Sequence, residues 1–228
     1  MPNVGEPLRR PGQSINHESG DPARRLYPKK KTVAASEQNQ QDRSAWGVQA
    51  GQFDARRLIF LDECGSTIAL SPRYGWALKG QRTSGSVPGN RGKNTTLIAS
   101  LGWNGLGEAM IFEGGTTAAL FEQYIEQILA PTLLPGQIVV MDNLSCHKGE
   151  KVRLAIEAKG CQLLFLPSYS PDFSPIEETF SNLKAFLRRV GARTREMLQE
   201  AICQALLTVT KQDAQGWFRH CGYLPLKE

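Results

Sequence analysis

The chain has 228 residues, which is enough for one substantial domain and a tail, and its Lys and Arg outnumber its Asp and Glu by 27 to 22. This excess favours a polyanionic partner. The five cysteines contain no C-x-x-C pair, which argues against a zinc site. No apolar run is long enough for a membrane span or for the core of a signal peptide, so we expect a cytoplasmic protein.

The N-terminal fifth of the chain is polar and basic. Residues 1–50 mix Pro, Gly, Gln, Asn, Ser and charged residues, and their few large apolar side chains define no helical or strand face. This composition predicts a flexible basic arm and linker over residues 1–50 and a folded domain over residues 51–228. Residues 32–48 are compatible with a polar helix that leads into the core.

Three short apolar runs predict buried strands. Residues 58–61 are apolar on both faces and are followed at once by Asp62 and Glu63. Residues 138–141 are rich in β-branched side chains and are closed by Asp142. Residues 163–166 form the third run. Two of the three predicted strands therefore end in an acidic residue.

The remaining elements complete a mixed α/β arrangement. Asn104-Gly105 lies between two apolar stretches, and this dipeptide predicts a hairpin because both turn residues need positive φ. Helices are expected over residues 116–130, near residues 149–159, from Pro175 onwards and over residues 194–210, because apolar residues recur there at helical spacing. Alternation of strands and helices predicts a mixed sheet.

The acidic residues that follow the strands form a candidate metal site. Open α/β sheets bind ligands beyond the carboxyl ends of their parallel strands, so Asp62 and Asp142 converge if their strands are neighbours. Two close carboxylates are favourable only when a cation or a proton compensates their repulsion, and oxygen ligands suit Mg²⁺ or Mn²⁺. Each Asp alone could equally be a turn former. Glu63 cannot share the site with Asp62 while the strand is regular, because successive side chains point to opposite faces.

A third carboxylate, that of Glu177, lies in the first turn of the helix predicted after Ser174. Ser174, Pro175 and Glu177 match an N-cap, a first-turn Pro and the acidic partner of a capping box, and a capping box explains Glu177 without any metal. At helical spacing, however, Glu177 is followed by Lys184 and Arg188 on one polar stripe. This stripe suits a metal followed by DNA phosphates, although an exposed helix face would look similar.

Several segments resemble a known family. LIFLDE, VVMDNLSCH and LFLPSYSPDFSPIEETFSNLK together resemble the bacterial IS-six-thirty branch of the Tc/mariner transposases, within the DDE superfamily. Thirty-four residues separate Asp142 from Glu177, as that branch has between its second and third acidic ligands. The pieces KKKTVAASEQ, RYGWALKG and NTTLIASLGWNGL add to the resemblance, which spans residues 29–225.

The resemblance implies a fold and an activity. It implies an RNase H-like mixed five-stranded sheet flanked by helices, in which Asp62, Asp142 and Glu177 hold two Mg²⁺ or Mn²⁺ ions. The implied reaction is cleavage of transposon ends followed by strand transfer into target DNA, at a TA step. Asn143 and His147 of the segment DNLSCH would orient a metal ligand or touch the scissile strand, although a His just after a strand is often a surface or capping residue.

The same resemblance implies partners and a setting. The partners are double-stranded DNA, as transposon ends and as target, and a second copy of the chain in a homodimer assembled on DNA. The setting is the bacterial cytoplasm, in association with the nucleoid. Residues 1–50 do not supply the helix-turn-helix region that the family carries upstream, so we expect that region to be missing from this chain.

Three other functions fit parts of the pattern. An RNase H-like, structure-selective nuclease would use the same fold and metals without strand transfer. An inactive transposase remnant would bind DNA without metal chemistry. A glycosidase could use two carboxylates, but the sequence lacks an aromatic-rich sugar platform and the Asp, Asp, Glu spacing has no explanation there.

Overall fold

A computed structural model of the chain describes residues 35–144 and 147–226. A compact unit begins at Ser36. The flexibility expected for residues 1–34 lies outside the described residues. None of the helices in the described ranges is long and apolar enough to cross a membrane.

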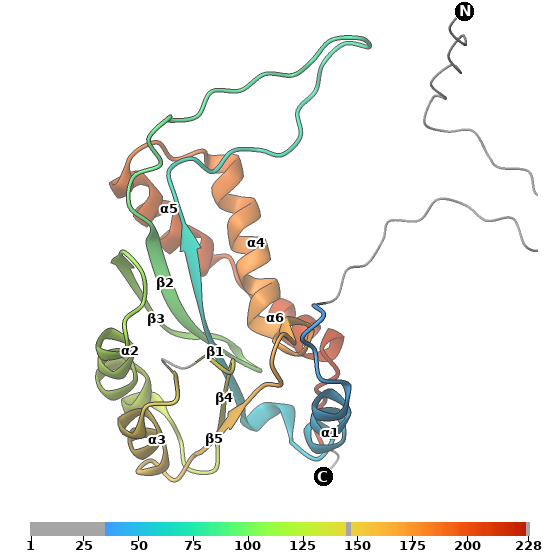
Figure 1. Cartoon of the computed structure of the whole chain (residues 1–228), viewed down its shortest axis with the longest axis vertical. Coiled ribbons are helices and arrows are strands. Elements are labelled where there is room, and N and C mark those ends of the chain that lie inside the picture. The colour runs from blue at the N-terminus through green and yellow to red at the C-terminus, as the bar shows by residue number, and fades with distance from the viewer. Residues whose placement is uncertain (1–34, 145–146, 227–228) are drawn as a thin grey trace, which may run out of the picture. The chain divides into compact units, whose positions relative to one another are not determined.

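A mixed five-stranded sheet forms the centre of the compact unit (Figure 1). Its strands stand in the order β3-β2-β1-β4-β5, with β1 antiparallel to β2 and parallel to β4. The β2–β3 pair is the expected hairpin, but its loop lies one residue earlier than predicted: Gly102 pairs with Gly105, so Trp103 and Asn104 form the loop. Gly105 has a positive φ of 129° and Asn104 does not, so the expected turn with two positive φ angles does not form. The strands are β1 (Leu58–Ser66), β2 (Thr95–Gly102), β3 (Gly105–Glu113), β4 (Ile138–Met141) and β5 (Gln162–Phe165).

Every helix expected from the periodicity is present, and one further helix follows them. Residues 118–132 remain helical through a π-helical turn and a 3₁₀ turn. The α-helices are α1 (Gln40–Ala50), α2 (Ala118–Tyr124), α3 (Glu150–Glu157), α4 (Pro175–Val190), α5 (Arg195–Leu207) and the additional α6 (Lys211–His220). The shorter helical turns are η2 (Ala55–Arg57), η3 (Ile125–Leu129), η4 (Ala130–Thr132) and η6 (Pro171–Phe173).

The two faces of the sheet pack against different helices, which are separated in Figure 1. Phe60 and Cys64 of β1 face a core shared with α4, α5 and α6, whereas Leu61 faces a core shared with α2, η3 and α3. Strand alternation therefore decides which side chain of β1 enters which core. Because β1 is paired on both edges and covered on both faces, its backbone is firmly held.

The helix α1 belongs to the folded unit, whereas the sequence assigned residues 1–50 to an arm. Its single buried residue is Trp46, whose Nε1 donates a hydrogen bond to the Tyr223 hydroxyl at 3.0 Å. That hydroxyl in turn donates to the carbonyl oxygen of Phe173 at 2.7 Å. One buried aromatic thus attaches the polar helix that the sequence suggested over residues 32–48, and this attachment is what composition alone did not reveal.

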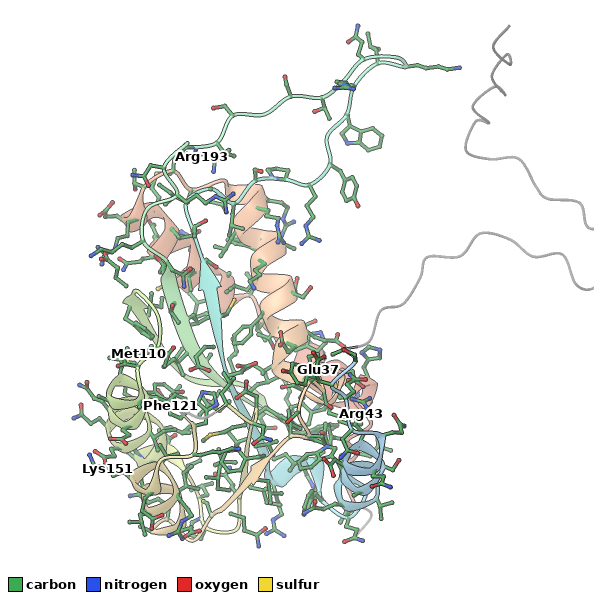
Figure 2. All side chains as sticks on the ribbon, viewed as in Figure 1. Glu37, Arg43, Met110, Phe121, Lys151 and Arg193 are labelled. Carbon is green, nitrogen blue, oxygen red and sulfur yellow. The ribbon has the colours of Figure 1, made fainter. Side chains whose placement is uncertain are left out.

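A long connection joins β1 to β2 and extends from the sheet (Figure 1). The Nη1 of Arg193 donates to the carbonyl oxygens of Ile68 at 3.0 Å and Leu70 at 2.9 Å, so the α4–α5 turn holds the base of the connection (Figure 2). Further out, the side chains of Tyr74 and Trp76 are fully exposed.

Candidate active site

Strand register brings the first two predicted carboxylates together. In the parallel β1–β4 pair, Leu61 stands opposite Met141, the last residue of β4. Asp62 and Asp142 are the next residues of the two neighbouring strands, so both lie at the carboxyl end of β4. The condition set by the sequence, that these two strands be neighbours, is therefore met.

The third predicted carboxylate enters from α4. Ser174 is the N-cap residue of this helix and Pro175 occupies its first turn, as expected. The Ser174 side chain, however, makes no capping hydrogen bond, so the predicted capping box does not form. The backbone N–H of Glu177 instead donates to the Ser174 carbonyl oxygen at 3.1 Å. Capping therefore does not account for the Glu177 carboxylate.

A cavity of about 310 Å³ is lined by Asp62, Asp142 and Glu177. Glu63 is not among its lining residues, so Asp62 and Glu63 do not share the site, as strand alternation predicted. In the described parts of the chain, no three His, Cys, Asp or Glu side chains are close enough to surround one ion as they stand. The three carboxylates thus share a cavity without forming a closed ligand cage.

The electrostatics of the cavity fit a cation. Burial, together with the negative charges of Glu177 and Asp142, raises the pKa of Asp62 to about 8, against the lowering effect of the Glu63 N–H. Burial also raises the pKa of Glu177, while Lys184 lowers it and Asp142 raises it. A divalent cation would relieve this repulsion, and three carboxylates are the oxygen donors that Mg²⁺ and Mn²⁺ prefer.

The two cations predicted to bind DNA lie further along α4. Lys184 and Arg188 are both half-buried. The charge of Lys184 acts on groups at the site. It lowers the pKa of Glu177, and it also lowers the pKa of the Cys64 thiol, which burial raises. The polar stripe therefore begins at the cavity and continues along the helix.

Asn143 links the two loops that border the cavity. Its side-chain Nδ2 donates to the Ser168 hydroxyl at 3.1 Å, and both residues line the cavity. Tyr169 lines it as well, with a positive φ of 55° and a mostly exposed side chain. The sequence pattern did not single out Ser168 or Tyr169, because the run of Pro and Ser around them indicates only a loop.

His147 is buried behind the cavity, so the surface or capping role considered for it is wrong. Its Nε2 lies 3.1 Å from Oε1 of Glu63, and its Nδ1 lies 2.6 Å from Oδ1 of Asp142 without the alignment of a full hydrogen bond. Its ring stacks on Phe121, with 4.2 Å between centroids (Figure 2 labels Phe121). Burial lowers the pKa of His147, but the contacts with Asp142 and Glu63 outweigh it and raise the pKa to about 10.

Comparison with known proteins matches residues 57–199 to the DDE superfamily endonuclease family. Curated protein sequences give no match. Among solved structures, the Mos1 strand transfer complex matches with a TM-score of 0.65 and 18% identity over 86% of this chain and 63% of that chain. The Mos1 mariner paired end complex with Mn gives 0.65 and 17% over 87% and 64%. The catalytic domain of Mos1 mariner transposase gives 0.56 and 14% over 86% and 92%.

The matches to solved structures concern the fold and cover part of the matched chains. The chain spans 63% of the length of the chain in the strand transfer complex, and at these identities the likeness concerns the fold. The predicted RNase H-like mixed five-stranded sheet flanked by helices is confirmed, as is the resemblance to the DDE superfamily. Assignment to the bacterial IS-six-thirty branch stays a prediction.

Proposed function

Because this chain belongs to the DDE superfamily endonuclease family, we propose that it is the catalytic domain of a DNA transposase. The proposed reaction is hydrolysis of a phosphodiester bond at a transposon end, which frees a 3′-hydroxyl, followed by attack of that hydroxyl on target DNA. The observation that carries the proposal is the cavity lined by Asp62, Asp142 and Glu177, which come from three separate elements. The TA target step rests on the sequence resemblance alone.

The donor set of the cavity assigns roles to its residues. When bound, two Mg²⁺ or Mn²⁺ ions supply activation of the oxygen nucleophile and neutralisation of the charge on phosphate. Asp62 would hold both ions from the central strand, Asp142 would hold one and Glu177 the other. Solved structures of Mos1 mariner paired end complexes with Mn and with Mg support the choice of divalent ions.

The cations of α4 complete the proposed interaction with DNA. Lys184 and Arg188 follow Glu177 by 7 and 11 residues, which places them about 10 and 16 Å along the helix axis. Phosphates of a strand whose scissile bond lies at the cavity would meet both side chains. Asn143, which lines the cavity, would border the scissile strand.

The partners follow from the same proposal. They are transposon ends, target DNA and a second copy of this chain, and the similar Mos1 structures, a strand transfer complex and a paired end complex, support them. Such a protein would act in the bacterial cytoplasm on the nucleoid. Recognition of the transposon ends would require the upstream helix-turn-helix region expected from the resemblance.

A strand-transfer assay with Mg²⁺ on DNA that carries the element's own ends tests the proposal. The wild-type chain, supplied with the end-recognition region, should release 3′-hydroxyl ends and join them to target DNA. Asp62→Asn, Asp142→Asn and Glu177→Gln should each abolish both steps because each removes a charge but little volume. Hydrolysis without joining would instead indicate the structure-selective nuclease, and absence of both would indicate an inactive remnant.

A matched control stands next to Glu177. Glu178→Gln makes the same chemical change one residue further along α4, where the side chain contacts His220 of α6 rather than the cavity. This variant should retain cleavage and joining near the wild-type level. If Glu178→Gln lost activity as completely as Glu177→Gln, the loss would reflect the removal of negative charge from the start of α4 and not the removal of a metal ligand.

A further inference from the structure

Three side chains in contact, the first of them partly exposed and the other two buried or nearly so, connect Asp142 through His147 to Glu63. Asp142 contacts His147, and His147 contacts Glu63, with the distances of 2.6 Å and 3.1 Å given above. The His147 side chain is 1% exposed and that of Glu63 13%. Since Glu63 does not line the cavity, its carboxylate cannot be a ligand of the proposed ions. It therefore requires another explanation.

The His147 ring is fixed on three sides. Phe121 supports one ring face, and each ring nitrogen faces a carboxylate oxygen. The ring is therefore held between the two carboxylates, with Nε2 toward Glu63 and Nδ1 toward Asp142.

The contact with His147 also determines which oxygen of the Asp142 carboxylate remains available. Oδ1 is engaged by His147 and accepts a hydrogen bond from the Leu144 N–H at 3.2 Å. Among the described residues, Oδ2 has no hydrogen-bond partner. Asp142 lies just after the last residue of β4 and its side chain is 37% exposed. Without the contact to His147, little in this environment would fix its rotamer.

We propose that Glu63 is a positioning residue, which acts through His147 to hold the Asp142 carboxylate in the orientation that binds a divalent ion. The contact of Glu63 with Nε2 fixes the orientation of the ring and so directs Nδ1 at Oδ1 of Asp142. Outer contacts of this kind orient metal ligands and tune their affinity. The inference rests on the proposed metal-dependent function, because it assigns a residue to the support of that site.

The alternative is that Glu63 merely balances a buried charge and stabilises the fold. Both roles predict that removal of Glu63 affects the protein, so a loss of activity would not separate them. Metal binding by the folded protein does separate them, since a purely structural role leaves the ion affinity of correctly folded molecules unchanged. Non-additivity between Glu63 and His147 then tests whether the effect passes through the histidine.

The experiment measures Mn²⁺ binding by electron paramagnetic resonance in the whole chain without DNA. Glu63→Gln keeps the volume and an acceptor oxygen but removes the charge, and we expect Mn²⁺ affinity to fall about 10- to 100-fold. His147→Gln should cause a similar loss, and Glu63→Gln should add little in that background. Glu108→Gln, which alters an exposed carboxylate on β3, is the matched control and should bind like the wild type.

Each outcome distinguishes a positioning role of Glu63 from a purely structural one. Wild-type affinity in folded Glu63→Gln, or losses that add fully in the double variant, overturn the inference and leave the proposed function intact. Failure of the wild-type chain to bind Mn²⁺ overturns the proposed function and the inference together. If Glu63→Gln does not fold, Glu63→Asp replaces it in the experiment. Because this variant retains the charge, its Mn²⁺ affinity should stay closer to the wild type than that of His147→Gln. A loss of Mn²⁺ affinity equal to that of His147→Gln overturns the inference.

Discussion

The affinity of the cavity for divalent ions should depend steeply on pH, because Asp62 must lose a proton to become a ligand. Burial, with the charges of Glu177 and Asp142, raises the pKa of Asp62 to about 8. A metal ion binds only the carboxylate form, so below this pH each binding event must also release a proton. Raising the pH from about 6 to about 8 is therefore the perturbation of choice.

The size of the effect follows from the pKa. With a value of about 8, roughly 1% of the Asp62 side chains are ionised at about pH 6 and about half are ionised at about pH 8. The apparent Mn²⁺ affinity should therefore increase about 50-fold over this interval. The raised pKa of Glu177 acts in the same direction.

Isothermal titration calorimetry in buffers of different ionisation enthalpy measures both the affinity and the proton release. We expect about one proton to leave per wild-type chain at about pH 7. Asp62→Asn cannot release this proton, so its weaker binding should vary much less with pH. Wild-type affinity that changes less than about threefold between pH 6 and 8, or a slope that Asp62→Asn leaves intact, would refute the reasoning.

Three further predictions concern stability and DNA. Because folding raises the pKa of Asp62 from 3.8, the stability of the metal-free protein should fall as the pH rises from 3.8 to about 8, and thermal unfolding of Asp62→Asn should lack this fall. Lys184→Ala with Arg188→Ala should reduce the slope of log affinity for duplex DNA against log salt by about 1.8, and an unchanged slope would place both side chains away from phosphates. Trp46→Phe removes the hydrogen bond to Tyr223 and should lower the free energy of unfolding in urea by about 1 kcal/mol.

The parts of the site that could be predicted from sequence are those set by local pattern. Apolar runs ending in Asp62 and Asp142 predicted two strands. Side-chain alternation predicted that Asp62 and Glu63 could not both enter one site, and the family resemblance selected Asp62. Pro175 marked the start of the helix that carries Glu177. In each case the information lies within a few residues of the side chain concerned, which is why sequence reasoning succeeds there.

Other features depend on contacts distant in sequence. Glu63 and His147 are 84 residues apart and meet only because β4 pairs with β1. The polar helix α1 depends on the contact of Trp46 with Tyr223, which is 177 residues away. The sequence pattern around these residues does not predict such distant contacts. The helix α6 is a different case: Thr210 and Asp213 form a capping box, a signal that is local in the sequence and did not enter the prediction.

The length of β1 shows how pairing modifies a pattern. Its apolar run ends at Leu61, and the sequence therefore placed Asp62 after the strand. The antiparallel partner β2 extends the strand through Ser66, so Asp62 lies within it and opposite Ala99. Asp62 is thereby held by a continuous ladder rather than by a turn, which makes its backbone more rigid than the sequence suggested.

The three carboxylates differ in freedom, and this difference determines how ions would be gathered. Asp62 stands on the central strand, and its Oδ1 also accepts a hydrogen bond from the Glu63 N–H at 2.7 Å. Asp142 follows a strand end and is held through one oxygen by His147. Glu177 lies in the first turn of α4 and lacks the capping contact that would restrain it. Since the described residues form no closed ligand cage, we expect closure around bound ions to come mainly from Glu177, with Asp62 held in place by the sheet.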